Sequence, residues 1–225
     1  MAWRCSAKSN AGLVQNMKTN GLIKSARVEK AMLAVDRQNY APAGCGYEDS
    51  PQRIGYRATI SAPHMHAHAL DLMERNLQPG CNVLDVGCGS GYMCAAMGRM
   101  VSEGGAAGKV LGIDYIEPLV ALSAGNMAKA DQDLVTSGHV KLQVGDGWKG
   151  SPGDAPFDAI HVGAAAASVP EALTTQLKKG GVMIIPVGPD GGAQYLLQIN
   201  KSATGQLSQQ NIMGVRYVPL VQPQK

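Results

Sequence analysis

Apolar runs of strand length alternate with segments of helical spacing through the middle of the chain. The runs lie near residues 82–86, 109–113, 140–144 and 158–162, and the helical segments lie near 92–102, 117–130 and 169–177. A fifth apolar run at 181–187 follows the last helix. Because strands that alternate with helices usually pair in parallel, this pattern predicts an α/β fold with a doubly wound, mainly parallel, Rossmann-like sheet.

The N-terminal third of the chain shows a different pattern. Residues 10–40 have helical spacing, and a further helix is expected from Pro63 to about Asn76. The prolines and glycines of residues 41–58 predict a loop between these helices. This third of the chain is therefore expected to form a helical cover over one end of the sheet.

The C-terminal part is predicted to add an antiparallel edge to the sheet. Two apolar runs near 193–200 and 206–219 have no helix between them, which favours a hairpin. The chain has 225 residues and no internal repeat, as expected for one domain. We therefore expect a single domain over 1–225, divided into a substrate-side part (1–80), a cofactor-binding core (81–190) and the hairpin (191–225).

Composition and charge narrow the class of partner. Apolar residues make up 45% of the chain and charged residues 16%, and the formal net charge is only +3. No basic run is longer than Lys178-Lys179, so no nucleic-acid partner is expected. The sequence has no apolar run of signal-peptide or membrane-span length, and its five cysteines form no CxxC pair. We expect a cytoplasmic protein and, because no apolar interface stretch is evident, a monomer.

A glycine-rich turn follows the first strand of the alternating region. It places alternate glycines after an acidic strand end, in the order Asp85, Gly87, Gly89, Ser90 and Gly91. Such a turn presents backbone N–H groups and the positive end of a helix dipole to a ligand. The dinucleotide pattern G-x-G-x-x-G would need a glycine where Tyr92 stands. The spacing G-x-G-x-G is similar to the cofactor loop of class I methyltransferases, which bind S-adenosyl-L-methionine.

Acidic residues follow the next strands at the same edge of the predicted sheet. Asp114 is expected to accept hydrogen bonds from both hydroxyls of a ribose. Asp146 is expected to accept from an adenine amino group, beside Gly147, which permits a close approach. Alternatively, each acid only caps a helix, and Asp85 either holds the loop backbone or points into the site. Cys88 has no adjacent base, so it is not expected to be a nucleophile.

The stretch between the N-terminal helices and the core carries the candidate substrate site. Thr59 and Ser61 place hydroxyls just before the helix that starts at Pro63, where free N–H groups can hold a carboxylate. The simpler alternative is that Ser61 only caps the helix. His64 and His68 lie four residues apart and can share a metal ion in principle. No third ligand is placed nearby, so no metal is expected.

These motifs belong to longer stretches that resemble one family. The stretches cover 49–52, 58–66, 84–91, 112–114, 144–147, 158–166, 186–188 and 213–220. Over nearly its whole length the chain resembles the animal-type protein-L-isoaspartate (D-aspartate) O-methyltransferases. The resemblance implies that Ser61 is the active-site serine. It also implies cofactor contacts from Ala58, Thr59, Ile60, Ser61, His66, Ser90, Asp114, Tyr115, Asp146 and Gly147.

Two positions depart from the animal-type pattern. Val221 stands where those enzymes typically have threonine, so a side-chain contact with substrate would be lost there and a backbone contact would survive. Trp148 stands where a smaller or basic residue is expected, and we expect it to alter the rim of the adenine site.

The resemblance implies transfer of a methyl group from S-adenosyl-L-methionine to the α-carboxylate of L-isoaspartyl and D-aspartyl residues in damaged proteins, which initiates repair and leaves S-adenosyl-L-homocysteine. An α-carboxylate has a pKa of about 3.5, so it is already ionised and needs alignment rather than a general base. We hypothesise that Ser61 orients this carboxylate, that Asp85 or Thr59 steadies it, and that His64 lines the peptide groove. Small apolar walls around Val162 would favour the cancellation of charge.

Three alternatives stay open at this point. A class I methyltransferase for another acceptor would share the glycine loop but not the string at 59–66. A nicotinamide-dependent oxidoreductase is disfavoured by Tyr92 and by the lack of a Tyr-x-x-x-Lys pair. A weakened, non-catalytic cofactor-binding homologue would retain the same loop.

Overall fold

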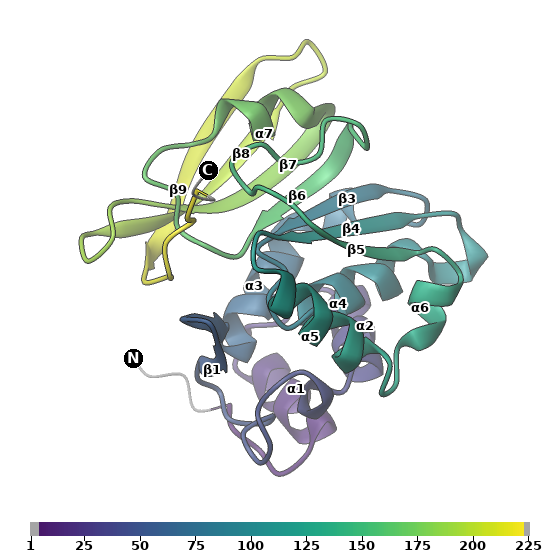
Figure 1. Ribbon diagram of the computed structural model, residues 1–225. Helices are drawn as coiled ribbons and strands as arrows, with labels where there is room; N and C mark the ends of the chain where they lie inside the picture. The colour runs from purple at the N-terminus through teal and green to yellow at the C-terminus, as the bar shows by residue number, and fades with distance from the viewer. Residues whose placement is uncertain (1–4, 223–225) are drawn as a thin grey trace.

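The computed structural model describes residues 5–222 and centres on a seven-stranded sheet in the order β5-β4-β3-β6-β7-β8-β9 (Figure 1). The strands are β3 (Asn82–Val86), β4 (Lys109–Asp114), β5 (Val140–Val144), β6 (Phe157–Val162), β7 (Leu177–Val187), β8 (Gln194–Lys201) and β9 (Leu207–Val215). The first five of these strands pair in parallel, and β7, β8 and β9 pair antiparallel. The predicted fold class is therefore confirmed.

Helices cover both faces of the sheet. One face carries α4 (Tyr92–Val101), α5 (Glu117–Met127) and α6 (Gln132–Thr136), and the other carries α7 (Glu171–Gln176). The N-terminal helices are α1 (Asn10–Thr19), α2 (Ala26–Ala34) and α3 (Pro63–Met73), and short 3-10 turns lie at Arg37–Asn39, Glu74–Asn76 and Glu103–Gly105. Figure 1 shows α1 and α2 as a further layer beneath α4, which confirms the helical cover. No helix among residues 5–222 is long and apolar enough to cross a membrane.

Alternation along the central strands decides which side chains reach the site, because successive residues point to opposite faces. In β3, Val83 packs in the core beneath α4, whereas Val86 packs in the second core with α7. Asp85 therefore faces the α4 side. In β6, Val162 packs in the second core, so it does not form the substrate wall that the sequence predicted. Its neighbour His161 faces the α4 side instead.

Part of the predicted loop at 41–58 is a strand. β1 (Gln52–Gly55) pairs antiparallel with β2 (Ala58–Ile60) in a small separate hairpin. The apolar pattern missed β1 because it is short and alternates between half-buried and exposed positions. This hairpin delivers the residues after it to the glycine loop.

The predicted strand at 206–219 is too long, because β9 ends at Val215. Residues 216–222, here called the C-terminal segment, leave the sheet and return to the end of β6. Ala165 donates its N–H to the Val218 carbonyl at 2.8 Å, and Leu220 donates its N–H to the Ala165 carbonyl at 2.7 Å. Two backbone hydrogen bonds therefore fix this segment across the edge of the sheet where the predicted site lies.

Candidate active site

The glycine loop at the carboxyl end of β3 is held against β4. Gly87 and Cys88 both donate their N–H groups to the Ile113 carbonyl, at 2.8 and 3.0 Å. Gly91 caps α4 with a φ of 86°, and a Cβ on it would lie 3.1 Å from Ser123 Cβ. Glycine suits this backbone conformation and so close a neighbour. The loop is therefore fixed at the start of α4, where free N–H groups and the helix dipole favour an anionic ligand.

A small cavity of about 30 Å³ lies between this loop and the predicted substrate segment. Eight of the residues predicted for the site line it, namely Thr59, Ile60, Ser61, His66, Asp85, Gly87, Gly89 and Ser90. Cys88, Tyr92, Met93, His161 and Gly163 complete the wall. The two halves that the sequence suggested separately therefore face one another across one cavity.

Asp85 is 1% exposed and belongs to a cluster of buried polar side chains. Its Oδ1 lies 2.7 Å from His161 Nδ1, and its Oδ2 accepts a hydrogen bond from the Cys94 thiol at 3.0 Å. A hydrogen bond with Cys88, together with burial, raises the pKa of Cys94 well above its ordinary value, so Cys94 stays a donor. The carboxylate is thus held by these side chains rather than by the loop backbone. His161 was not predicted as a site residue, although it is the register partner of Asp85 across β3 and β6.

Asp114 fastens the glycine loop to the end of β4. Its Oδ2 accepts from the Gly89 N–H at 3.2 Å, and its Oδ1 accepts from the Ile116 N–H at 3.1 Å. Burial raises the pKa of this carboxyl. Each oxygen keeps a further lone pair, so these bonds leave acceptor capacity for a ribose. The neighbouring Tyr115 is 37% exposed beside it.

Gly147 is confined by the chain itself. A Cβ on Gly147 would lie 2.7 Å from Val86 Cγ1 and 2.8 Å from Leu220 Cδ1. Asp146 accepts from the Trp148 N–H at 3.0 Å, and the Trp148 indole donates to the Leu220 carbonyl at 2.9 Å. Trp148 therefore fastens the C-terminal segment. The groups that approach Gly147 closely are therefore the side chains of Val86 and Leu220.

Ser61 does not cap α3. The N-cap residue is Ala62, and Asp49 accepts a hydrogen bond from the His64 N–H at 3.1 Å. Asp49 also lies 2.7 Å from His64 Nδ1. The simpler interpretation of Ser61 is therefore wrong, because a carboxylate from a distant segment satisfies this helix end. Ser61 borders the cavity instead.

Tyr217, in the C-terminal segment, has the Ser61 side chain as a neighbour. The Gln194 side chain holds its backbone, accepting from the Tyr217 N–H at 2.7 Å and donating to the Tyr217 carbonyl at 3.3 Å. Burial raises the pKa of Tyr217 to about 12, and the neighbouring Ser61 hydroxyl opposes that rise. Tyr217 therefore keeps a neutral hydroxyl beside Ser61. The sequence analysis quoted Tyr217 only as part of a family-like string and gave it no role.

Val162 and Val221, both predicted to contact the substrate, are not among the residues that line the cavity. Val162 is buried in the second core, and Val221 is 40% exposed.

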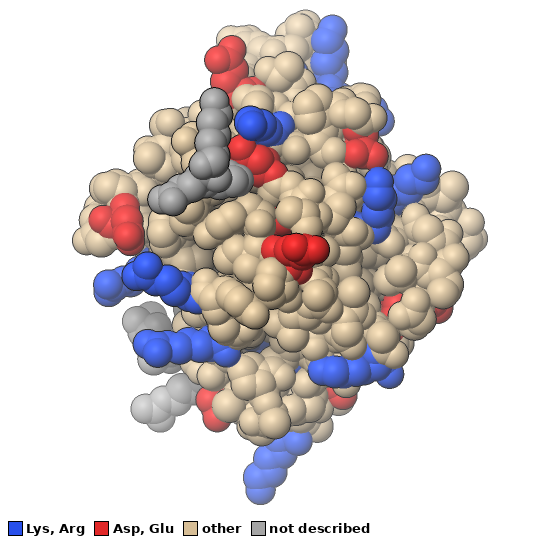
Figure 2. Space-filling model, in the orientation of Figure 1, with Lys and Arg blue, Asp and Glu red and all other residues tan. Residues whose placement is uncertain are grey.

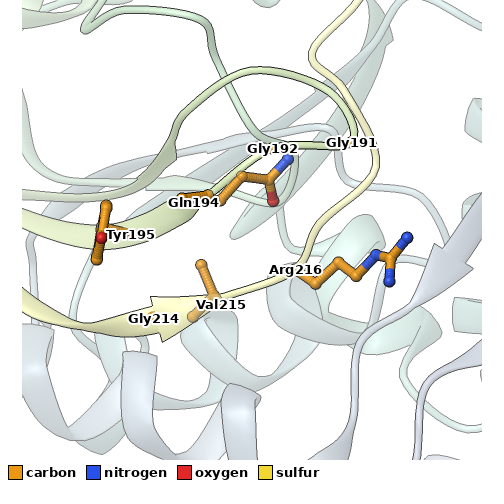
Figure 3. Close-up of a pocket in the computed structure, with 8 residues that line it drawn as sticks. Gly191, Gly192, Gln194, Tyr195, Gly214, Val215 and Arg216 are labelled. Carbon is orange, nitrogen blue, oxygen red and sulfur yellow. The ribbon is translucent and has the colours of Figure 1, made fainter.

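A second, wider hollow of about 530 Å³ lies between β8, β9 and the loop before β8 (Figure 3). Its lining contains one charged side chain, Arg216, and neither a carboxylate nor a thiol. Within residues 5–222, no group of three or more His, Cys, Asp or Glu side chains is arranged to hold a metal ion.

Known proteins can now be set beside this geometry. The family model for protein-L-isoaspartate(D-aspartate) O-methyltransferase matches residues 8–225. The chain belongs to this family. A family member from Caenorhabditis elegans is 46% identical over 98% of this chain and 96% of its own length. Protein-L-isoaspartate O-methyltransferase 1 of Arabidopsis thaliana is also 46% identical, over 96% of this chain and 92% of its own length.

A solved structure of the same family supports the fold. The protein-L-isoaspartate O-methyltransferase of Plasmodium falciparum, crystallised with S-adenosyl-L-homocysteine, superimposes with a TM-score of 0.88. It is 32% identical and covers 96% of this chain and 99% of that chain. The resemblance drawn from the sequence motifs is therefore confirmed at the level of the family and the fold.

Proposed function

We propose that this protein transfers a methyl group from S-adenosyl-L-methionine to the α-carboxylate of L-isoaspartyl and D-aspartyl residues in damaged proteins and peptides. The observation that carries the proposal is the cavity in which Ser61 faces the glycine loop. Family membership supports the same reaction, and the Plasmodium falciparum relative binds the product cofactor. The methyl ester formed would be the first intermediate in repair.

The residues around the cavity fit this cofactor. Gly87 has a φ of 73°, and a Cβ built on it would meet nothing closer than 3.9 Å, so its backbone is open to a ligand. Asp114 and Asp146 lie at the ends of neighbouring strands and would hold the ribose and the adenine. His66, Ser90 and the backbone of the glycine loop would hold the amino-acid end. When bound, the cofactor supplies an electrophilic methyl group on a positively charged sulfur.

The chain's own residues need only position the acceptor. The substrate α-carboxylate is ionised at neutral pH, so no proton has to be removed from it. Ser61 would donate a hydrogen bond to this carboxylate from the wall of the cavity, with the Tyr217 hydroxyl beside it. Ile60 and Met93 supply apolar wall that excludes water. A cation and an anion give neutral products, so a dry site favours the transition state over the separated reactants.

The decisive experiment compares two peptides that differ only in one linkage. Radiolabelled methyl groups should pass from S-adenosyl-L-methionine to an isoaspartyl peptide and not to its normal aspartyl twin. The label should be released by mild base, as expected for a methyl ester. Equal labelling of the two peptides, or no labelling of either, would refute the proposal.

A methyltransferase for nucleic acid is the alternative that the surface disfavours. Figure 2 shows Lys and Arg side chains scattered over one face, with acidic side chains among them and no continuous basic surface. A nucleic-acid partner would require such a surface. Incubation with RNA and DNA in the same labelling assay is expected to give no transfer.

The setting of the reaction is also part of the proposal. All five cysteines are free thiols, which suits a reducing compartment such as the cytoplasm. Large exposed apolar side chains such as Leu33, Val144 and Leu207 come from different elements. We propose a cytoplasmic monomer, and light scattering at assay concentration tests the oligomeric state.

A further inference from the structure

Arg37 is a buried cation behind the candidate site. It is 0% exposed, and no salt bridge among residues 5–222 includes it. Its Nη2 donates to the Ser61 carbonyl at 2.6 Å, and its Nη1 lies 3.1 Å from His66 Nδ1. Its Nε has no hydrogen-bond partner. Burying an arginine without a carboxylate partner is costly, so its position calls for an explanation beyond packing.

The contact with Arg37 fixes the protonation of His66. A guanidinium has donors and no acceptor, so His66 Nδ1 must accept and the ring proton must sit on Nε2. Burial and the positive charge of Arg37 both lower the pKa of His66 well below its ordinary value. His66 is therefore a neutral ring whose remaining polar atom is an N–H donor.

The same arginine braces the glycine loop. The Arg37 guanidinium lies 5.3 Å from the centre of the Tyr92 ring, and the His66 ring stacks on Tyr92 at 5.0 Å with 23° between the planes. Tyr92 is the first residue of α4, directly after the loop. His66 and Tyr92 both line the cavity. Arg37 thus contacts both walls of the site, by hydrogen bonds on one side and by a cation–π contact on the other.

We propose that Arg37 is a positioning residue that presents the His66 Nε2–H, together with its own positive charge, to a carboxylate in the cavity. The inference rests on the proposed function, which brings two carboxylates to this site. One belongs to the amino-acid end of the cofactor and the other to the isoaspartyl residue. Holding the ligating histidine by a second residue behind it is a common way to fix a tautomer and a ring orientation.

The first test uses the unaltered protein. Nitrogen-15 NMR of labelled histidine should show His66 at pH 7 as a single neutral form, with Nε2 protonated and Nδ1 bare. The signals are assigned by their loss in His66→Gln. A proton on Nδ1, or rapid exchange between the two tautomers, would overturn the proposal. This result does not depend on methyltransferase activity, so it separates failure of the inference from failure of the proposed function.

The second test replaces the arginine. Arg37→Met keeps the length and removes the donors, and it should raise a Michaelis constant by about tenfold, the scale of one lost charge-assisted hydrogen bond. Arg37→Lys keeps the charge and one donor and should restore part of the loss. If both variants fail to fold, the tautomer measurement decides alone.

Ligand binding distinguishes the two carboxylates. If the cofactor's carboxylate is held, Arg37→Met weakens S-adenosyl-L-homocysteine but not 5′-methylthioadenosine, which lacks the amino-acid end. If the substrate carboxylate is held, both affinities are unchanged and the Michaelis constant for isoaspartyl peptide rises. Loss of thermal stability with neither change would show that Arg37 only packs, and would refute the proposal.

Arg27 provides a matched control. It also joins the N-terminal helices to the core, through Glu74, Glu103 and the carbonyls of Leu77 and Met100. None of these residues lines the cavity. Arg27→Met should lower the melting temperature and leave both Michaelis constants and both ligand affinities unchanged.

Discussion

The cofactor half and the substrate half of this site are built in different ways. The cofactor half is local, because Asp85, the glycine loop and Asp114 each follow directly from the end of a parallel strand. The substrate half is assembled from Arg37, the stretch around Ser61 and Tyr217, which lie far apart in the chain. In a parallel sheet the carboxyl ends of the strands lie at the same edge, so the residues of the cofactor half come together through strand pairing alone. The substrate half depends in addition on individual hydrogen bonds between distant segments.

The largest effect is expected from the substrate half. Ser61→Ala removes the hydroxyl that we propose orients the acceptor, and turnover should fall about 100-fold, the scale of losing one well-placed donor. Steady-state kinetics with an isoaspartyl peptide checks this. Ser25→Ala is the control, since it removes only the cap of α2, and normal turnover in Ser61→Ala would remove Ser61 from the mechanism.

Gly147→Ala tests how tightly the two halves pack together. The new Cβ would meet Val86 and Leu220 at less than 3 Å, so unfolding free energy should fall by about 2 kcal/mol. Urea titration measures the change. Gly125→Ala in α5 is the control, because a Cβ there meets nothing within 4 Å and alanine should stabilise the helix. An unfolding free energy equal to that of the parent protein would mean that the C-terminal segment can shift away from the new Cβ at little cost.

Asp114→Ala probes the local half. The Michaelis constant for S-adenosyl-L-methionine should rise about tenfold, because the variant loses both a ribose acceptor and the bond that fastens Gly89. Turnover at saturating cofactor should stay close to that of the parent protein. Asp133→Ala, at an exposed carboxylate paired with Arg99, should leave the constant unchanged. An unaltered constant in Asp114→Ala would contradict the ribose assignment.

Stability should depend on pH through His66. Burial and the charge of Arg37 lower the pKa of His66 in the folded protein. Below about pH 6.5 the imidazole is therefore protonated in the unfolded chain but still neutral in the folded protein. Stability is therefore complete above that pH and falls by up to about 1.4 kcal/mol per pH unit below it. Urea titrations of the parent and His66→Gln from pH 7.5 to 5.5 measure the difference. Parallel curves would argue against a buried neutral histidine.

The smallest effect is expected at Tyr217. Tyr217→Phe keeps the ring and loses the hydroxyl beside Ser61, so kcat/KM for the peptide should fall about fivefold, equivalent to about 1 kcal/mol. Tyr195→Phe changes an exposed tyrosine of β8 and should have no effect. A loss of kcat/KM as large as that of Ser61→Ala would contradict the assignment of the orienting hydrogen bond to Ser61 and would favour Tyr217 as its donor.

Much of the fold could be predicted because its signals are short-range. The central strands and the glycine loop follow from apolar runs and from the residues at their ends. The half-buried strand β1 could not be predicted, since only its pairing with β2 makes it a strand. Val162 was misplaced for a related reason: residues 158–166 show that a strand reaches the site, but only its register with β3 shows which side chains face the cavity.

Most of the hidden parts of the site depend on distant contacts. Nothing near Arg37 in the sequence shows that its guanidinium will lie behind Ser61 and His66. Likewise, Asp49 gives no local sign that it satisfies the start of α3, which is what leaves Ser61 available. Hydrophobic periodicity predicts which side of an element is buried. It does not predict which atoms a buried polar side chain contacts, and the roles of Arg37 and Asp49 depend on those contacts.

Because the C-terminal segment contributes to the site, the site can be completed only after the end of the chain has been synthesised. A ribosome has already produced every strand of the sheet before it adds Tyr217, Val218 and Leu220. The strand ends that would receive the cofactor can therefore form while the cover over Ser61 has not yet been synthesised. A nascent chain of this protein would be expected to hold its methyl donor before it can present a damaged protein to it.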